Sequence, residues 1–269
     1  ALRGARPGQP DLELVHRLDR DTSGCLLVAK RRAALRDLHL QLREGQTEKH
    51  YLALVCGKWN LGTKRIELAL DTDERRSGER HVAVRAHGKK SVSTFKPVQF
   101  FGNLATLLEV EIDTGKTHQI RVHAAHAGHP VAGDDKYGNR IFNGIFKDYG
   151  LKRMFLHSSS LGFTRPGTRE PMLASAPLPP ELSAVLDTLT RGKARAPQDE
   201  RGKTLKPEGA RGPIVAPRVQ RPAPVVQTGK PRMGNPRTGG AKPGKPGLVK
   251  GSGPVRGEGR RRARTTGGR

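Results

Sequence analysis

The amino-acid sequence predicts an α+β fold in residues 1–189, built on a bent, mixed and mostly antiparallel β-sheet with a few flanking helices. Three observations lead to this prediction. Short apolar runs of strand length alternate with Gly-containing turns through the middle of the chain. Amphipathic helical spacing is confined to a few segments. The composition changes near residue 190, where a separate tail begins.

The tail, residues 190–269, differs from the rest of the chain in charge and in residue types. It carries 21 Lys and Arg against 4 Asp and Glu, whereas residues 1–189 carry 29 against 21. It has 16 Gly and 11 Pro but no Phe, Trp or Tyr. Such a segment cannot bury enough apolar surface to offset the chain entropy lost on folding. We therefore expect a disordered basic tail after one folded domain.

The first elements follow from local patterns. Cys25–Ala29 is an apolar run after a Thr-Ser-Gly turn and is typical of a buried strand. Leucines recur on one helical face of residues 33–43, and Gly45 follows as a stop signal, which predicts a short amphipathic helix.

The middle of the chain reads as a meander of strands. Turn signals such as Ser77-Gly78 and Phe101-Gly102-Asn103 separate runs that are rich in strand-forming residues. The predicted strands cover residues 51–56, 65–70, 81–86, 91–101 and 104–112, and a strand pair is predicted over residues 153–164.

Two helices are predicted in the second half of the domain. Thr117 as N-cap and Gly128 as stop predict a helix over residues 118–127, with Arg121 near its start. Four apolar residues share one helical face after Pro179-Pro180 and predict a closing helix: Leu182, Val185, Leu186 and Leu189.

The densest group of reactive side chains is HRLDRDTSG at residues 16–24. Asp19 lies between Arg17 and Arg20, and neighbouring cations favour the ionised form of a carboxyl group. Charged residues on a loop that a rigid scaffold holds are a common layout for a catalytic site. A surface ion pair beside a turn explains the same residue types equally well.

Four histidines between residues 118 and 129 suggest a metal site, but their spacing opposes it. Only His123 and His126 are three apart on the predicted helix, and no Cys or HExxH pattern accompanies them. Capping and RNA contacts are the favoured roles for these side chains. No Walker loop or GxGxxG follows a strand. We therefore predict neither a metal nor a cofactor.

Five motifs are spread over the domain: HRLDRDTSG at 16–24, KHYLALV at 49–55, TGKTHQIRVH at 114–123, GHPVAGDDKYG at 128–138 and FLHSSSLGF at 155–163. Together they resemble the Rlu-type pseudouridine synthases, most of all the RluC branch that modifies large-subunit ribosomal RNA. The resemblance covers roughly residues 11–189 in the family's order and spacing. It implies a pseudouridine synthase catalytic domain whose active-site cleft crosses the middle of the sheet.

The resemblance also implies roles for individual residues. Asp19 matches the family's catalytic aspartate, and Arg17 matches an arginine that helps to hold the flipped nucleotide. Tyr51 matches the aromatic residue that stacks on the target base. Arg121 matches the arginine that pairs with the catalytic carboxylate, and Leu156 matches an apolar residue that lines the uracil pocket. In isolation, Tyr51 and Leu156 would be interpreted as core residues.

The implied reaction is the isomerisation of uridine to pseudouridine in RNA. It breaks the bond from C1′ to N1, turns the uracil and rejoins it through C5, so it needs no cofactor. The sequence leaves open whether Asp19 adds to the sugar or the base, or removes the C2′ proton. It also leaves open alternative functions: a synthase acting on tRNA rather than 23S ribosomal RNA, a uridine-specific N-glycosidase, and a noncatalytic basic RNA-binding protein.

Further expectations concern the setting of the protein. Cys25 and Cys56 lie in apolar runs and are expected to be small buried hydrophobes in a reducing environment. The chain has no long apolar run and no signal-peptide pattern, so we expect it to be cytoplasmic and not to bind a membrane. The resemblance implies RNA, above all ribosomal RNA, as the partner, and we expect a monomer. It begins at Ala1 without methionine. We therefore expect a fragment that lacks the family's S4 RNA-binding domain and the strand with an Asn-Lys-Pro-x-Gly motif before the HRLD loop.

Overall fold

The computed structural model describes Gly4 and residues 12–74, 80–192, 197–198 and 202–207. Its main feature is an eight-stranded sheet with the order β10-β9-β4-β8-β7-β5-β6, to which the short strand β2 adds on β9. The strands are β2 (Ser23–Gly24), β4 (Glu48–Cys56), β5 (Lys64–Glu74), β6 (Arg80–Val84), β7 (Lys89–Phe101), β8 (Ala105–Ile112), β9 (Leu156–Thr164) and β10 (Pro171–Ser175). A separate pair joins β1 (Glu13–Leu14) to β3 (Val28–Ala29).

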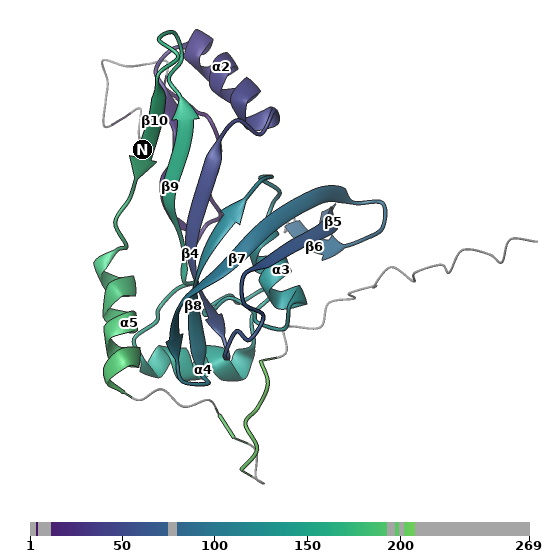
Figure 1. Cartoon of the computed structure of the whole chain (residues 1–269), viewed down its shortest axis with the longest axis vertical. Coiled ribbons are helices and arrows are strands. Elements are labelled where there is room, and N and C mark those ends of the chain that lie inside the picture. The colour runs from purple at the N-terminus through teal and green to yellow at the C-terminus, as the bar shows by residue number, and fades with distance from the viewer. Residues whose placement is uncertain (1–3, 5–11, 75–79, 193–196, 199–201, 208–269) are drawn as a thin grey trace, which may run out of the picture. The chain divides into compact units, whose positions relative to one another are not determined.

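The pairing confirms the predicted mixed, mostly antiparallel sheet. Only β2 runs parallel to its neighbour in the eight-stranded sheet, whereas the remaining pairs are antiparallel. Strands β10, β9 and β4 run almost vertically in Figure 1, and β7 and β5 lead away to one side, so the sheet is bent. The strand order places β8 in the middle of the sheet, with β4 beside it.

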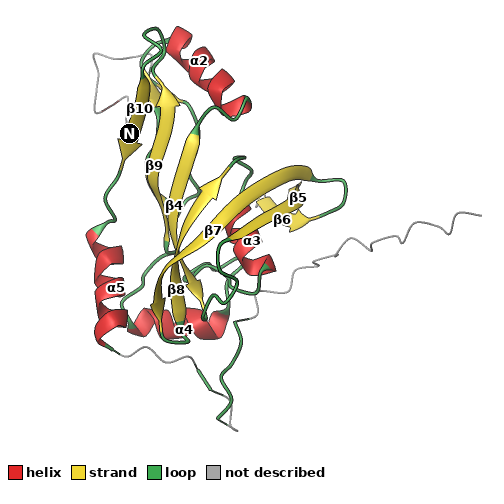
Figure 2. Cartoon of the chain, viewed as in Figure 1, coloured by secondary structure: helices red, strands yellow, loops and turns green. Residues whose placement is uncertain are grey.

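Helices cover the sheet at several places (Figure 2). They are α2 (Arg32–Arg43), α3 (Gln119–His126), α4 (Arg140–Asp148) and α5 (Pro180–Arg191). Helices α4 and α5 contribute Phe142, Phe146, Leu182, Val185 and Leu189 to a core cluster with Leu54, Leu104 and Phe155 of the sheet side. Helix α3 packs Ile120 and Ala124 into a second cluster around Trp59 and Phe95. The predicted helices at 33–43, 118–127 and after Pro179-Pro180 are thus present, within a residue or two at their ends.

Several local predictions were wrong. Cys25–Ala29 is not a continuous buried strand. Leu26 is exposed, and only Val28–Ala29 forms a strand, which pairs with β1. Thr117 is not the N-cap of α3, since His118 occupies that position with a left-handed backbone (φ 54°). The pair expected within residues 153–164 is the single strand β9, whose partner β10 was missed.

Helix α4 was also missed. Its N-cap is Asn139, whose side chain accepts hydrogen bonds from the backbone N–H groups of Ile141 and Phe142. Asn is a favoured N-cap residue, and Phe142 and Phe146 recur at helical spacing behind it. Both signals were therefore present in the sequence.

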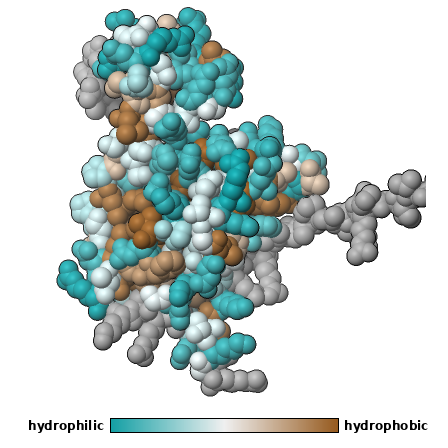
Figure 3. Space-filling model, viewed as in Figure 1, coloured by the Kyte–Doolittle hydropathy of each residue, from teal (hydrophilic) through white to brown (hydrophobic). Residues whose placement is uncertain are grey.

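Both cysteines are free and buried, as expected. Helix α5 continues to Arg191, and an isolated antiparallel bridge joins Gln198 to Thr204. Residues 193–196, 199–201 and 208–269 of the predicted tail lie outside the described residues. Figure 3 shows a mainly hydrophilic surface around α2, whereas hydrophobic residues reach the surface lower down, near α5. No helix in the described ranges is long and apolar enough to cross a membrane.

Candidate active site

The HRLDRDTSG loop is fixed to the sheet by its last residues. Ser23 and Gly24 pair in parallel with His157 and Ser158 of β9. Gly24 has φ 112° and packs directly on the Ser158 carbonyl, so a side chain there would clash with the β9 backbone. Ser23 Oγ also lies 2.9 Å from His157 Nδ1. This end of the loop is rigid, and it holds Asp19 over the middle of the sheet.

A second anchor comes from Arg153, which precedes β9. Its Nη2 donates to Ser23 Oγ at 2.9 Å and its Nη1 donates to the Asp21 carbonyl at 3.1 Å. Within the loop, the Thr22 N–H donates to the Asp19 carbonyl at 3.0 Å and closes a turn. The conformation around Asp19 is therefore specified from both sides.

One cavity of about 110 Å³ collects all five residues that the resemblance singled out. Arg17 and Asp19 come from the loop before β2, Tyr51 from β4, Arg121 from α3 and Leu156 from the start of β9. These positions are up to 139 residues apart in sequence, from Arg17 to Leu156. The fold brings them to one place at the central strands of the sheet. What each residue does there is addressed under the proposed function.

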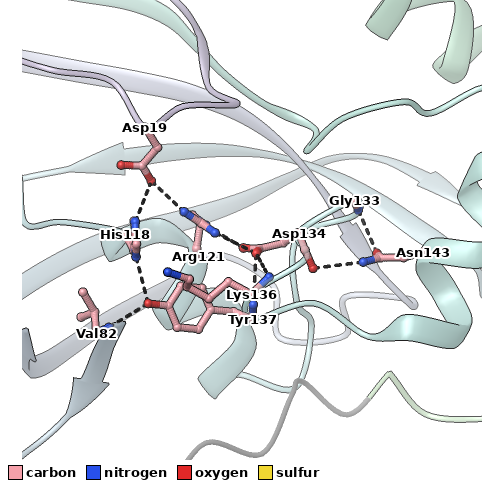
Figure 4. A network of polar contacts seen from close by, with 9 residues as sticks. All are labelled: Asp19, Val82, His118, Arg121, Gly133, Asp134, Lys136, Tyr137 and Asn143. Carbon is pink, nitrogen blue, oxygen red and sulfur yellow. Dashed lines mark hydrogen bonds and ion pairs between the residues drawn. The ribbon is translucent and has the colours of Figure 1, made fainter. Parts of the chain in front are cut away.

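Arg121 is the hub of the polar network in this cavity (Figure 4). Its Nη1 donates to Asp19 Oδ2 at 3.2 Å. Its Nε and Nη2 donate to the two carboxylate oxygens of Asp134 at 2.7 and 2.8 Å. Burial lowers the pKa of the Arg121 guanidinium, but the hydrogen bonds and charges of Asp134 and Asp19 outweigh this effect and raise the pKa above its ordinary value. Arg121 is therefore a permanent cation between two acids.

Asp134 is a member of this network that sequence reasoning missed. It is 1% exposed, and its Oδ1 also accepts hydrogen bonds from the backbone N–H groups of Lys136 and Tyr137. Asn143 of α4 holds the same turn, because it donates to the Asp134 carbonyl and accepts from the Gly133 N–H. A Gly-Asp-Asp sequence after a helix indicates only a turn, so it gave no signal that Asp134 faces Arg121.

His118 approaches the same carboxylate oxygen of Asp19 as Arg121 does. Its Nε2 is 4.0 Å from Asp19 Oδ2, and its Nδ1 is 2.9 Å from the Tyr137 hydroxyl. The Val82 N–H donates to that hydroxyl oxygen at 2.8 Å, which leaves the phenolic proton free to point at His118 Nδ1. Burial and the Arg121 charge lower the pKa of His118 to about 4, although Asp19 acts in the opposite direction. At neutral pH the imidazole is uncharged and directs Nε2–H towards Asp19.

Gln119 fixes the unusual backbone at His118. Its side-chain oxygen accepts from Thr114 Oγ1 and from the Lys116 N–H, and its Nε2 donates to the Val92 carbonyl at 2.8 Å. A left-handed conformation at a non-glycine residue persists only where the surroundings specify it. This buried side chain supplies that constraint, so the turn before α3 presents His118 to the cavity.

Tyr51 and Leu156 form apolar walls of the cavity. Leu156 is 3% exposed and belongs to the core cluster around Trp59. Tyr51 lies where β9 carries one extra residue opposite β4, and its hydroxyl hydrogen-bonds Ser158. Burial raises the pKa of Tyr51, so its ring enters the cavity in the neutral form.

The two helical histidines do not converge on a common point. His123 is fully buried and its Nε2 lies 2.8 Å from Ser91 Oγ, whereas His126 is exposed. Among the described residues, no group of three His, Cys, Asp or Glu side chains is arranged to hold a metal ion. The chemistry available in the cavity is therefore that of a carboxylate, a guanidinium, a neutral imidazole and an aromatic face.

Comparison with known proteins points to one family. Residues 1–126 match the family model described as RNA pseudouridylate synthase. The chain is 50% identical over 193 residues to "Ribosomal large subunit pseudouridine synthase C" of Haemophilus ducreyi. The aligned residues cover 72% of this chain and 60% of the relative. The protein of that name from Escherichia coli K12 is 49% identical over 194 residues, or 71% of this chain and 60% of the relative. The chain thus spans about 60% of the length of these curated relatives.

Two solved human structures resemble the fold, both with a TM-score of 0.57. "Human RNA Pseudouridylate Synthase Domain Containing 1" is 28% identical and the match covers 74% of this chain and 85% of that chain. "Human RNA Pseudouridylate Synthase Domain Containing 4" is 20% identical, with 70% and 80% covered, and shows the likeness of the fold alone.

Proposed function

We infer that this chain, which belongs to the family of Rlu-type RNA pseudouridine synthases, converts uridine to pseudouridine in RNA, with large-subunit ribosomal RNA as its substrate. The observation that carries the proposal is the position of Asp19. Its carboxylate is 3.2 Å from Arg121 Nη1 at the wall of a cavity that Tyr51 and Leu156 also line. A noncatalytic RNA-binding protein has no need of an acid held in this way.

The proposed role of Asp19 is that of the reacting carboxylate. Arg121 neutralises it electrostatically and orients it, while the uncharged His118 adds an N–H on the same side without adding a second positive charge. Asp19 then either adds to the sugar or the base, or removes the C2′ proton, so that the C1′–N1 bond breaks. The uracil turns, C5 bonds to C1′, and the proton lost from C5 is balanced by the one that N1 gains.

The walls of the cavity suit a flipped uridine. Extruding a nucleotide from its stack costs a few kcal/mol, and stacking on an aromatic ring such as that of Tyr51 returns ~1–3 kcal/mol. Arg17 is exposed at the entrance and we propose that it holds the flipped nucleotide. Leu156 excludes water from the opened sugar, which separates isomerisation from hydrolysis to free uracil.

The substrate assignment rests on the relatives, whose names specify the ribosomal large subunit. Because the chain spans about 60% of their length, the substrate remains a proposal for the chain as it stands. We further propose that it acts as a monomer in the cytoplasm, where ribosomal RNA is available; sedimentation velocity tests the oligomeric state.

The test is to incubate the chain with unmodified 23S ribosomal RNA and with unmodified tRNA, each labelled with tritium at uridine C5. Tritium release together with chemical mapping of pseudouridine in the 23S RNA is the expected result. Chromatography of the small-molecule fraction checks for free uracil. Release of uracil without pseudouridine would make the chain an N-glycosidase, and modification of tRNA alone would overturn the ribosomal substrate.

A further inference from the structure

The cavity of about 110 Å³ that Asp19, Tyr51 and Leu156 line is called the uridine cavity below. A larger cavity, of about 630 Å³, adjoins it. It lies between the end of α2, the start of β4 and the loop from β8 to α3, and Figure 1 shows α2 leading into β4 at this place. The two cavities share five lining residues: Arg17, Tyr51, Ile112, Gly115 and Lys116. An RNA strand that leaves the uridine cavity past Tyr51 therefore enters this larger cavity, which we call the Lys49 cavity.

Lys49, two residues before Tyr51 on β4, is the unusual group of the Lys49 cavity. It is only 7% exposed, and its Nζ makes one hydrogen bond, to Thr47 Oγ1 at 3.2 Å. Nowhere in the described part of the chain does a carboxylate oxygen lie within 4.0 Å of Nζ. Burial lowers the pKa of Lys49, an effect that the more distant Asp113 opposes. A buried ammonium group whose only partner is neutral is costly unless an anion accompanies it.

The other charges around the Lys49 cavity favour an anion. Arg17, Arg43 and Lys116 add three exposed cations. The acids there, Glu44 and Asp113, already have partners: Gln46 Nε2 donates to Glu44 at 2.8 Å and Arg65 Nη2 donates to Asp113 at 2.9 Å. The balance of four cations against two acids leaves the cavity positive.

His16 does not add a further charge to the Lys49 cavity. Its Nε2 accepts a hydrogen bond from the Leu27 N–H at 3.0 Å, which an imidazolium cannot do. Burial and the nearby Lys49 lower the pKa of His16, so the ring is neutral at pH 7.

The cavity on the opposite side of Asp19 has a different balance. It measures about 590 Å³ and is lined by four cations, Arg17, Arg20, Arg121 and Lys136, and by four acids, Asp19, Asp21, Asp134 and Asp135. Equal numbers of the two signs give a phosphate no net attraction. Of the two neighbours of the uridine cavity, the Lys49 cavity is the one suited to a phosphate.

We propose that the Lys49 cavity binds a phosphodiester of the RNA strand immediately next to the target uridine, with Lys49 as the buried cation that receives it. This inference rests on the proposed function, because it takes the target uridine to lie against Tyr51 and Asp19. A phosphate contact positions a strand without reading its sequence. Lys49 thus acts on the register of the strand and leaves the choice of base to the uridine cavity.

The experiment measures binding of a nine-nucleotide RNA with a single central uridine, which fixes the register. Each linkage near the uridine is replaced in turn by a neutral methylphosphonate, and affinity is measured by fluorescence anisotropy. For the wild-type chain we expect one linkage beside the uridine to lose about tenfold in affinity, which corresponds to one charge-assisted contact. In Lys49→Met the same replacement should have no further effect, and the salt dependence should flatten by about 0.7 in the log–log slope.

The matched control is Lys147→Met, at an exposed position of α4 that lines none of the three cavities. It should keep the wild-type response to the methylphosphonate. Lys49→Gln replaces Lys49→Met if thermal unfolding shows that the methionine variant does not fold. Equal responses of the wild-type chain and the Lys49 variant at every linkage would overturn the proposal. Because binding is read separately from turnover, failure of the wild-type chain to form pseudouridine counts against the proposed function instead.

Discussion

Arg121 gives two of its three nitrogens to Asp134 and only the third to Asp19. The two contacts with Asp134 measure 2.7 and 2.8 Å, whereas the contact from Nη1 to Asp19 measures 3.2 Å. Asp134 is itself fixed by the backbone N–H groups of Lys136 and Tyr137. Asp134 therefore sets the plane of the Arg121 guanidinium. The direction in which Nη1 donates to Asp19 is fixed by this plane.

Asp19→Asn is expected to lower pseudouridine formation by about 100- to 10,000-fold, because the amide cannot act as a base or nucleophile. RNA affinity and thermal stability should stay close to those of the wild-type chain. Tritium release from C5-labelled RNA measures the rate. Asp21→Asn, an exposed acid of the same loop, is the control and should be nearly as active as the wild-type chain. A near wild-type rate in Asp19→Asn would remove Asp19 from the mechanism.

Arg121→Lys is expected to be a severe change although it keeps the charge. Lysine cannot hold Asp134 through two atoms and reach Asp19 with a third. The loss of one hydrogen bond between charged groups, ~1.5–3 kcal/mol, predicts a fall of about 10- to 100-fold in turnover. Single-turnover rates at saturating RNA measure it. Wild-type turnover in this variant would mean that a point charge suffices.

Asp134→Asn tests the orienting role of the buried acid. Breaking a buried ion pair by removing one charge typically costs about 3–5 kcal/mol, so the free energy of unfolding should fall by that order. Asp135→Asn, next in sequence but exposed, should change it by less than about 0.5 kcal/mol. Urea denaturation followed by circular dichroism compares the two. Equal stabilities would show that Asp134 is dispensable for holding Arg121.

The stability of the chain should fall as the pH is lowered from about 6.5 towards 4. Burial is the main cause that lowers the pKa values of His118 and His123 from 6.5 to about 4 in the folded chain. In this window the unfolded chain binds protons that the folded chain does not, so stability decreases by up to about 1.4 kcal/mol per pH unit for each histidine. Urea denaturation between pH 7 and 5 measures the slope.

His123→Leu is the variant that checks this assignment. His123 is fully buried, and Ser91 Oγ keeps its hydrogen bond to the Leu68 carbonyl when the imidazole is removed. The pH dependence of unfolding should therefore be shallower than in the wild-type chain. Parallel curves for the two proteins would show that His123 does not contribute.

Deletion of residues 208–269 is expected to weaken RNA binding most at low salt and to flatten its salt dependence. The segment is rich in Lys and Arg and contains no aromatic residue that would stack on a base. Its contacts should therefore be with phosphates. Such contacts release counterions from the RNA, so the affinity that they add falls as the salt concentration rises. The modified positions should stay the same. Titrations at several salt concentrations compare full and shortened chains, and equal affinities throughout would make the tail a spacer or a solubility device.

Local patterns in the sequence were sufficient for most of the fold. Strand-length runs with turns between them predicted β4 to β8, and leucine spacing predicted α2. The failures occurred where a distant contact decides the backbone. The run after Gly24 is apolar, which predicted a continuous strand. Ser23 and Gly24 instead pair with β9, and the chain turns before the next strand begins at Val28. Residue preference cannot anticipate such a partner, because it reflects only neighbours along the chain.

For the site, the sequence by itself determined which residue types are available: an acid between two arginines, an aromatic residue on a strand, and an arginine at the start of a helix. The resemblance then grouped Asp19, Arg17, Tyr51, Arg121 and Leu156. Only the tertiary structure decided that these side chains line one cavity, that Asp134 holds Arg121 more closely than Asp19 does, and that Lys49 is buried beside a neutral partner. The physical reason is that hydrogen bonds and burial depend on distances in space, and those distances are set when the sheet brings β4, β9 and α3 together.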